Sequence, residues 1–128
     1  MRLLLDTHIF LWFISGDSRL SATLQAILRD PANDVYLSVA SIWEAVIKHQ
    51  LSKLPLPQPP AIYLPLQRQN HRISSLGIDE MTIAFLPQLP TLHRDPFDRI
   101  LICQALQHDL TIVTVDAAIL AYPVSTLK

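Results

Sequence analysis

The sequence predicts an α/β fold with three layers, in which helices cover both faces of a central parallel sheet of four to five strands. Three observations lead to this prediction. Short, continuously apolar segments recur along the chain, as is typical of strands buried on both faces. Segments with apolar residues at helical spacing lie between them. Strands that alternate with helices form parallel sheets with right-handed crossover connections.

The first expected strand, Leu3 to Leu5, is continuously apolar and is followed at once by polar residues. The later ones are rich in valine, isoleucine, threonine and tyrosine, which favour extended backbone. The second strand follows a turn signal at Asn33 and Asp34. The expected strands cover residues 3–5, 35–39, 72–76, 111–115 and, at an edge of the sheet, 124–126.

Capping residues mark the ends of several expected helices. Gly16 suits a C-terminal cap, and Ser21 and Asp79 suit the start of a helix. Asp95 before Pro96 is the pattern of an N-terminal cap followed by proline at the first helical position. The expected helices cover residues 8–14, 21–29, 41–50, 62–70, 79–85 and 96–107, with a helical turn at 117–121.

Residues 54–65 hold several prolines and no glycine. Proline inside a helix removes a hydrogen bond and crowds the preceding turn, so we expect an extended connector or the start of a short helix here. A stiff loop between two helices is favoured over a proline-rich recognition ligand, which is the alternative.

The bulk composition indicates one small domain, residues 1–128, with enough apolar residues for a core. The formal net charge is −1 and there is no basic stripe, which excludes nucleic-acid binding driven mainly by counterion release. Only 16% of the residues are charged. This low fraction indicates either apolar surface covered by a partner or a small, well-filled core.

The only cysteine, Cys103, falls in an apolar helical run, so we expect it in the core. One cysteine forms no intramolecular disulfide, which is compatible with a reducing cytoplasm. The apolar start resembles a signal peptide until Asp6, Thr7 and His8 interrupt it. The next apolar stretch, 9–14, is too short to cross a bilayer. We therefore expect a soluble cytoplasmic protein without membrane association.

Four acidic residues, Asp6, Glu44, Asp98 and Asp116, are the candidate functional residues. Asp6 and Asp116 each follow an expected strand directly, and parallel sheets bind ligands beyond the carboxyl ends of their strands. Two carboxylates about 4–5 Å apart repel each other by roughly 3–4 kcal/mol at an effective dielectric constant of ~20. A divalent cation relieves this repulsion, so the pattern points to metal-dependent phosphodiester chemistry.

Each of these residues also has a structural alternative. Asp6 and Asp116 suit N-terminal caps, worth ~1 kcal/mol. Asp98 suits a favourable charge in the first turn of a helix. Ser41 and Glu44 form the Ser-x-x-Glu pattern of a capping box. Against that reading, Glu44 has apolar neighbours and therefore needs a polar partner.

Four segments together resemble the PIN-domain family, and most of all the VapC-type toxins of bacterial toxin–antitoxin pairs. They are Leu-Leu-Asp-Thr-His at 4–8, Ser-Ile-Trp-Glu at 41–44, His-Arg-Asp-Pro-Phe-Asp-Arg at 93–99 and Thr-Ile-Val-Thr-Val-Asp at 111–116. The resemblance spans nearly the whole chain, and the segment at 93–99 is its most specific part. Cys103 stands where many relatives have alanine.

The resemblance implies a PIN-like sheet flanked by helices and an endoribonuclease that depends on Mg²⁺ or Mn²⁺. It implies that the four acidic residues form the family's metal-binding quartet, with the Thr114 hydroxyl near the metal and with Asp95 as either an addition to the site or a helix cap. It also implies RNA as substrate, a homodimer and a cognate antitoxin protein. We expect the dimer interface or antitoxin groove at the apolar first helices and the proline-rich connector.

Arginines and aromatic residues near these segments have two readings each. Arg94 and Arg99 suit paired hydrogen bonds to RNA phosphates, or structural ion pairs. Trp12 and Trp43 suit base stacking, but their apolar helical runs favour burial in the core or at a partner interface. His8 beside Asp6 suits a metal ligand, although a capping or partly buried histidine is favoured.

Three rival functions remain open from the sequence. A catalytically silent PIN-fold RNA-binding or scaffold module would keep the fold but gain nothing from clustered carboxylates. A DNA-directed nuclease would use the same metal chemistry, since discrimination requires contacts to the 2′-hydroxyl. A phosphoacceptor signalling domain also places an aspartate after a strand. It lacks support here, because no adjacent acidic pair ends the first strand and no lysine follows a late one.

Overall fold

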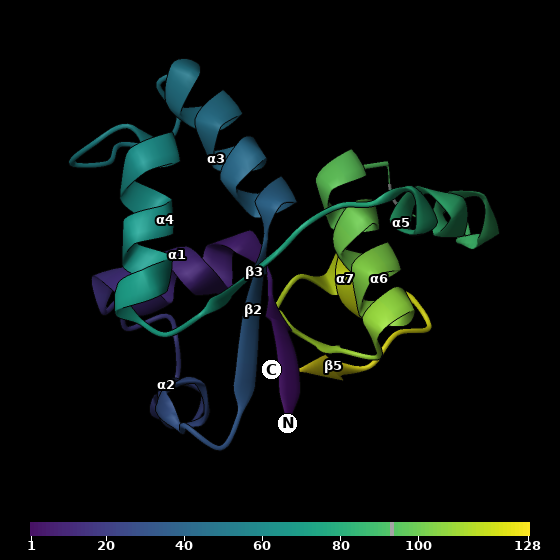
Figure 1. Cartoon of the computed structure of the whole chain (residues 1–128), viewed down its shortest axis with the longest axis horizontal. Helices are drawn as coiled ribbons and strands as arrows, with labels where there is room; N and C mark the ends of the chain where they lie inside the picture. Colours follow the sequence, from purple (N-terminus) through teal and green to yellow (C-terminus); the bar gives the residue numbers. More distant parts are fainter. Residues whose placement is uncertain (93) are drawn as a thin grey trace.

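The computed structural model describes residues 1–92 and 94–128 and contains one parallel sheet of five strands. Helices cover both faces of this sheet (Figure 1), which confirms the expected α/β architecture. The strand order is β3-β2-β1-β4-β5, so β1 lies at the centre. The strands are β1 (Arg2–Leu5), β2 (Asp34–Ser38), β3 (Ser74–Leu76), β4 (Thr111–Val113) and β5 (Thr126–Leu127).

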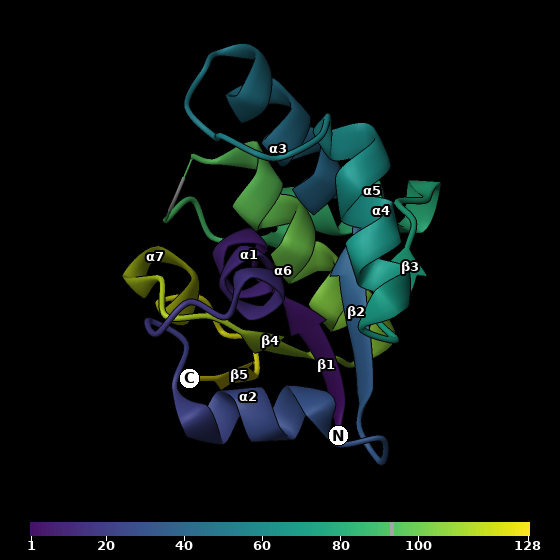
Figure 2. The ribbon, with the colours of Figure 1, turned by 90° about the vertical axis from the view of Figure 1, so that its left-hand side faces the viewer.

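Two layers of helices enclose the sheet. In Figure 1, α1, α2 and α4 lie to the left of the strands, and α5, α6 and α7 lie to the right. The helices are α1 (Thr7–Ser15), α2 (Ala22–Arg29), α3 (Val39–Gln50), α4 (Pro60–Asn70), α5 (Glu80–Phe85), α6 (Pro96–His108) and α7 (Ala117–Leu120), with a 3₁₀ turn at Leu86–Gln88. Figure 2 shows α3 beyond the arrowheads of β1 and β2, at the carboxyl edge of the sheet.

Burial on both faces of the sheet explains the apolar sequence of the central strand β1. Leu3 and Leu5 belong to one hydrophobic cluster, with residues of α1, α2 and α4. Leu4 points to the opposite face and belongs to a second cluster, with residues of α6 and α7. All three leucines are fully buried. These three positions lie where the sheet is covered on both faces and has no solvent side, so each of them is apolar.

Several expected helix ends are confirmed. Gly16 ends α1 in the left-handed region, at φ 65°, and the side chain of Ser21 caps α2. Asp79 forms a reciprocal capping box with Thr82 at the start of α5. Cys103 is fully buried, as expected. Within residues 1–92 and 94–128, no helix is long and apolar enough to span a membrane.

The expected start of α3 was wrong. The Ser38 hydroxyl accepts a hydrogen bond from the Ala40 N–H, so the helix begins at Val39 and β2 ends at Ser38. Ser41 lies inside the helix and therefore forms no capping box with Glu44. Its hydroxyl instead accepts a hydrogen bond of 2.9 Å from the Thr7 hydroxyl of α1.

The proline-rich connector is also shorter than expected, because α4 begins at Pro60 and contains Pro65. A proline inside a helix loses one hydrogen bond, a cost that tertiary packing can offset. Leu64, next to Pro65, is fully buried in the first cluster, and α4 packs along α3. This packing holds the helix together across the proline.

Three strands differ from their expected limits. β3 begins at Ser74 rather than 72, because Arg72 adopts a left-handed backbone with φ 57°. β4 ends at Val113, two residues early, and β5 covers only Thr126–Leu127. The early end of β4 leaves Thr114 beyond the strand, where its side chain is available to the site.

Candidate active site

The strand order creates a switch point at the centre of the sheet. From β1 the chain proceeds to β2 and β3 on one side, and then crosses to β4 and β5 on the other. Ligands of open parallel sheets bind at such a point, beyond the carboxyl ends of the strands. Leu5 pairs with Val113 there. Asp6 and Thr114 are the next residues on the two strands and so lie side by side.

Thr114 connects the two aspartates at this edge. Its hydroxyl donates a hydrogen bond of 2.8 Å to Oδ2 of Asp6 and accepts one of 3.0 Å from the backbone N–H of Asp116. Thr114 is fully buried and Asp6 is nearly so, at 5% exposed. The Asp6 N–H is also held, by the carbonyl of Val113 at 3.0 Å. The Asp6 carboxylate is therefore fixed in position.

Burial raises the pKa of Asp6 above its ordinary value of 3.8, and the Asp116 carboxylate adds to this rise. The Thr114 hydroxyl, the charge of His8 and the Thr7 N–H act in the opposite direction but do not cancel it. The interactions that the protein makes with the ionised Asp6 carboxylate do not offset the cost of burying its charge. A cation at this position would favour the ionised form.

The two aspartates differ in how they relate to the following helix. Asp116 is exposed, and its Oδ1 accepts a hydrogen bond of 2.9 Å from the Ala118 N–H at the start of α7. The capping interpretation is therefore correct for Asp116. Asp6 precedes α1 but makes no side-chain capping hydrogen bond. Its side chain turns to Thr114 instead, so capping does not account for Asp6.

Glu44 lies on α3 and is 7% exposed. Its polar partner is Lys48, one turn further along the helix, with Nζ 3.0 Å from Oε2. Lys48 was not among the residues predicted from the sequence, although a Glu–Lys spacing of four residues is a known signal for such a pair. This ion pair compensates the Glu44 charge in the absence of any other cation.

Asp95 and Asp98 have different roles at the start of α6. Oδ1 of Asp95 accepts hydrogen bonds from the N–H groups of Phe97 at 2.9 Å and Asp98 at 3.3 Å, which makes Asp95 the helix cap. Asp98 itself is 7% exposed in the first turn. Helices α6 and α3 pack together through the rings of Phe97 and Trp43, whose centroids are 5.0 Å apart.

The structure brings some of the expected residues together and not others. Asp6, Thr114 and Asp116 lie together at the switch point, whereas Glu44 and Asp98 lie on the packed helices α3 and α6. Over residues 1–92 and 94–128, no three histidine, cysteine, aspartate or glutamate side chains form a group that could hold a metal ion. A common metal-binding role of the four carboxylates therefore stays a prediction.

Arg99 is engaged in the fold. Its guanidinium donates to the carbonyls of Pro90 at 3.1 Å and Leu86 at 3.2 Å, and to the Tyr122 hydroxyl at 3.1 Å. These contacts favour the structural reading of Arg99 over the phosphate-binding one. Arg94 is exposed and stays a candidate for phosphate binding. The neighbouring residue of the sequence motif, His93, lies outside the described residues.

Trp43 is 58% exposed, so its expected burial in the core was wrong, whereas burial at a partner interface stays a prediction. The favoured reading of His8 was also wrong. His8 is exposed rather than partly buried, and it lies within α1 and not at its cap. Helical periodicity alone does not distinguish a core-facing residue from one at the rim of an apolar stripe.

Comparison with known proteins identifies the family of this fold. The family model described as the PIN domain matches residues 3–124. The chain belongs to the PIN domain family. Among curated proteins, ribonuclease VapC16 of Mycobacterium tuberculosis is 42% identical over 55 residues, which are 43% of this chain. The matched stretch covers 39% of the length of VapC16, so it supports kinship without spanning either protein.

Solved structures extend the likeness over the entire fold. The VapBC2 structure from Rickettsia felis, bound to a DNA fragment from its promoter, has a chain with TM-score 0.74 and 16% identity, covering 99% of this chain and 98% of that one. A toxin–antitoxin complex from Klebsiella pneumoniae has one with TM-score 0.62 and 16% identity, covering 98% and 96%. At these identities, the likeness shows the PIN fold and not the activity.

Proposed function

We propose that this PIN domain is a metal-dependent endoribonuclease, the VapC-type toxin of a toxin–antitoxin pair. The observation that carries the proposal is the buried Asp6 carboxylate at the switch point, held by Thr114 beside Asp116. The partial kinship with ribonuclease VapC16 supports RNA as the substrate. The structural likeness to a toxin–antitoxin complex supports an antitoxin partner.

The residues at this edge fit a hard divalent cation, Mg²⁺ or Mn²⁺, in their chemistry. Such ions take carboxylate, hydroxyl and water oxygens as ligands, and Asp6, Asp116 and Thr114 offer these donors. In our proposal Asp6 and Asp116 hold the ion, and Glu44 and Asp98 complete the site directly or through water. The bound ion would supply charge stabilisation at the scissile phosphate and lower the pKa of an attacking water.

The remaining residues of the site prepare these carboxylates. The Thr114 hydroxyl orients Asp6 and holds the backbone of Asp116, so the two carboxylates keep one relative position. Lys48 balances Glu44 until another cation approaches. Asp95 caps α6 and thereby sets the position of Asp98. Arg94 would meet a phosphate of the RNA backbone, because a guanidinium pairs with phosphate oxygens.

We also propose that the protein acts in the cytoplasm, as a homodimer inhibited by its cognate antitoxin. The apolar surface supports partners of this kind. Trp12, Leu54, Leu56 and Tyr63 line a hollow of ≈ 380 Å³ between α1 and the proline-rich connector. This location agrees with the groove expected from the sequence, and co-purification with the product of a neighbouring short reading frame would test it.

The decisive experiment is cleavage of a mixed RNA pool by the purified protein with Mg²⁺, with Mn²⁺ or with EDTA. Asp98→Asn is expected to lower the metal-dependent rate by at least about 100-fold. The matched control is Asp109→Asn, which lies at the other end of α6, is exposed, and has φ 54°, a conformation that asparagine tolerates. This control should keep wild-type activity.

Each other outcome has a defined meaning. Equal loss in both variants would indicate a general effect on α6, and cleavage in EDTA would exclude metal dependence. Cleavage of DNA but not RNA would assign a DNA-directed nuclease. RNA binding without cleavage in any metal would assign a catalytically silent binding module.

A further inference from the structure

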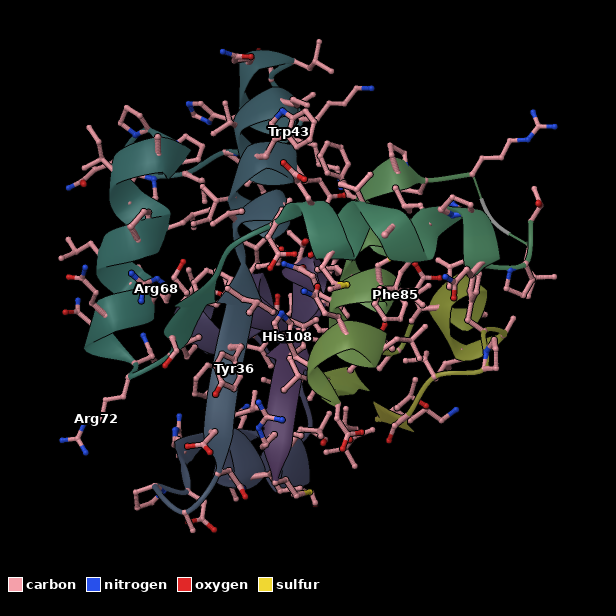
Figure 3. All side chains as sticks on the ribbon, turned by 45° about the vertical axis from the view of Figure 1, so that its right-hand side comes forward. Tyr36, Trp43, Arg68, Arg72, Phe85 and His108 are labelled. Atoms are coloured by element: carbon pink, nitrogen blue, oxygen red, sulfur yellow. The ribbon has the colours of Figure 1, made fainter. Side chains whose placement is uncertain are left out.

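The proposed function does not use the exposed ring of Trp43, although base stacking was one of its readings from the sequence. Trp43 directly precedes Glu44 on α3, and 58% of its surface is accessible to solvent. Figure 3 shows its position on α3. A tryptophan left this exposed presents a large flat aromatic surface to the solvent.

A second aromatic ring holds Trp43 in place. Phe97, which directly precedes Asp98 on α6, packs against it edge to face, with an interplanar angle of 85°. Such a pair is a favoured aromatic geometry. Each member of the pair is thus adjacent in sequence to one candidate carboxylate. The packing of α3 against α6 fixes the orientation of the ring before any ligand binds.

Two hollows flank this pair. Trp43 borders one of ≈ 550 Å³, together with Arg94 and Arg99. Phe97 borders the other, of ≈ 410 Å³, with Glu44 and Lys48. Arg94 and Pro96 line both hollows, so the two are neighbours. Among the described residues that line the hollow beside Trp43, the charged ones are both arginines.

We propose that Trp43 is a stacking platform for a base of single-stranded RNA beside the reacting phosphate, with Arg94 holding the adjoining backbone. This inference rests on the proposed ribonuclease function. A flat aromatic face stacks on any nucleobase, and the positive charge of Arg94 beside it attracts the phosphates. Within the described residues no carboxylate forms an ion pair with Arg94, so its charge is available to a polyanion.

The alternative occupant is a second copy of the chain. A two-fold interface places the same patch of each copy against the other. The arginines beside Trp43 in one copy would then face those of the other copy within an apolar interface, where their like charges repel. A polyanion gains from the same arginines. Charge complementarity therefore favours RNA at this surface.

Fluorescence tests the stacking directly, because the chain has only two tryptophans. In the Trp12→Phe variant, Trp43 is the sole tryptophan. Titration with single-stranded RNA oligonucleotides in EDTA, which prevents metal-dependent cleavage, should quench its emission. An abasic oligonucleotide with the same backbone should quench it much less. Quenching that is absent, or equal for both oligonucleotides, would overturn the proposal.

Affinity measurements give a second, independent test. Trp43→Ala should weaken RNA binding about tenfold or more, and Trp43→Phe should retain most of it. The matched control is Ile62→Ala, an exposed apolar residue on α4 at 63% exposure, which should bind like wild type. The logarithm of the RNA association constant falls as the logarithm of the salt concentration rises, and Arg94→Gln should make this slope shallower by about 0.7.

Sedimentation of the same variants distinguishes the rival occupant. If Trp43→Ala dissociates a dimer while RNA affinity is unchanged, the surface is an interface between copies and the proposal fails. The cleavage assay is separate from these measurements. RNA binding that depends on Trp43, without cleavage, would support this inference and contradict the proposed nuclease function. Cleavage by a protein whose RNA affinity is unchanged by Trp43→Ala would support the nuclease function and contradict this inference.

Discussion

The Thr114 hydroxyl donates a 2.8 Å hydrogen bond to the Asp6 carboxylate, although the two residues are 108 positions apart in the sequence. The pairing of β1 with β4 brings them together. Both side chains are buried, so water cannot readily take the place of either hydrogen-bonding partner. This contact couples the first and last thirds of the chain at the candidate site.

Replacing Thr114 with valine tests this contact. Valine has nearly the same shape but no hydroxyl, so Asp6 loses a donor and the Asp116 N–H loses its acceptor. We expect a destabilisation of about 1–3 kcal/mol in urea unfolding. Thr114→Ser keeps the hydroxyl and should cost clearly less. Equal losses in the two variants would show that the methyl group, and not the hydrogen bond, is what matters.

Asp6 should make the metal-free protein less stable as the pH rises. Its pKa is higher in the folded state than the unfolded value of 3.8, so between the two values the folded protein binds more protons. Stability therefore falls as the pH rises from about 3.8 through the folded-state pKa. Asp6→Asn removes this contribution and should be at least as stable as wild type at pH 7 in EDTA. Urea unfolding from pH 4 to 7 measures both effects, and a less stable variant at pH 7 would contradict the assignment.

Metal binding should make the wild type more stable than the Asp6→Asn variant. If Asp6 is a ligand, Mg²⁺ binds the folded wild type and stabilises it, by about 2.7 kcal/mol when the ion is at 100 times its Kd. Asp6→Asn should gain much less in the same titration. Thermal melts with and without Mg²⁺ make the comparison. Equal shifts in the two proteins would remove Asp6 from the metal site.

Substitutions of Asp95 separate its capping role from metal binding. Asp95→Ala removes the hydrogen bonds to Phe97 and Asp98 and should cost ~1 kcal/mol. Asp95→Ser restores a capping oxygen without a carboxylate and should recover that stability together with RNA cleavage. If the serine variant is stable but inactive, Asp95 has a direct role in the chemistry beyond the cap.

Arg99 and Arg94 should respond differently to the same change. Arg99→Gln removes the guanidinium that holds the carbonyls of Leu86 and Pro90 and the Tyr122 hydroxyl. We expect a loss of about 1–3 kcal/mol, because acceptors in the fold lose their donor. Arg94→Gln changes an exposed side chain and should stay within about 0.5 kcal/mol of wild type. Chemical unfolding of both variants compares them, and a larger loss at Arg94 would reverse the assignment.

Local sequence patterns were sufficient for most of the secondary structure. The apolar run at Leu3–Leu5 and the caps at Ser21, Asp79 and Asp95 predict their elements because the interactions responsible lie within a few residues. The same locality explains the errors. Ser41 matches a capping box in sequence, but the competing cap at Ser38 starts the helix earlier. Pro65 is tolerated because α4 packs on distant parts of the chain.

The sequence by itself determined the fold class, the alternation of strands and helices, and the positions of Asp6 after a strand and of Asp95 and Asp98 at the start of a helix. Only the tertiary structure decided which of them meet. It paired Asp6 with Thr114, packed Trp43 against Phe97 and left the Trp43 ring largely in solvent. These outcomes depend on strand order and helix packing, which join residues far apart in the chain. No local pattern encodes such contacts, because burial and partner choice arise only when the whole core assembles.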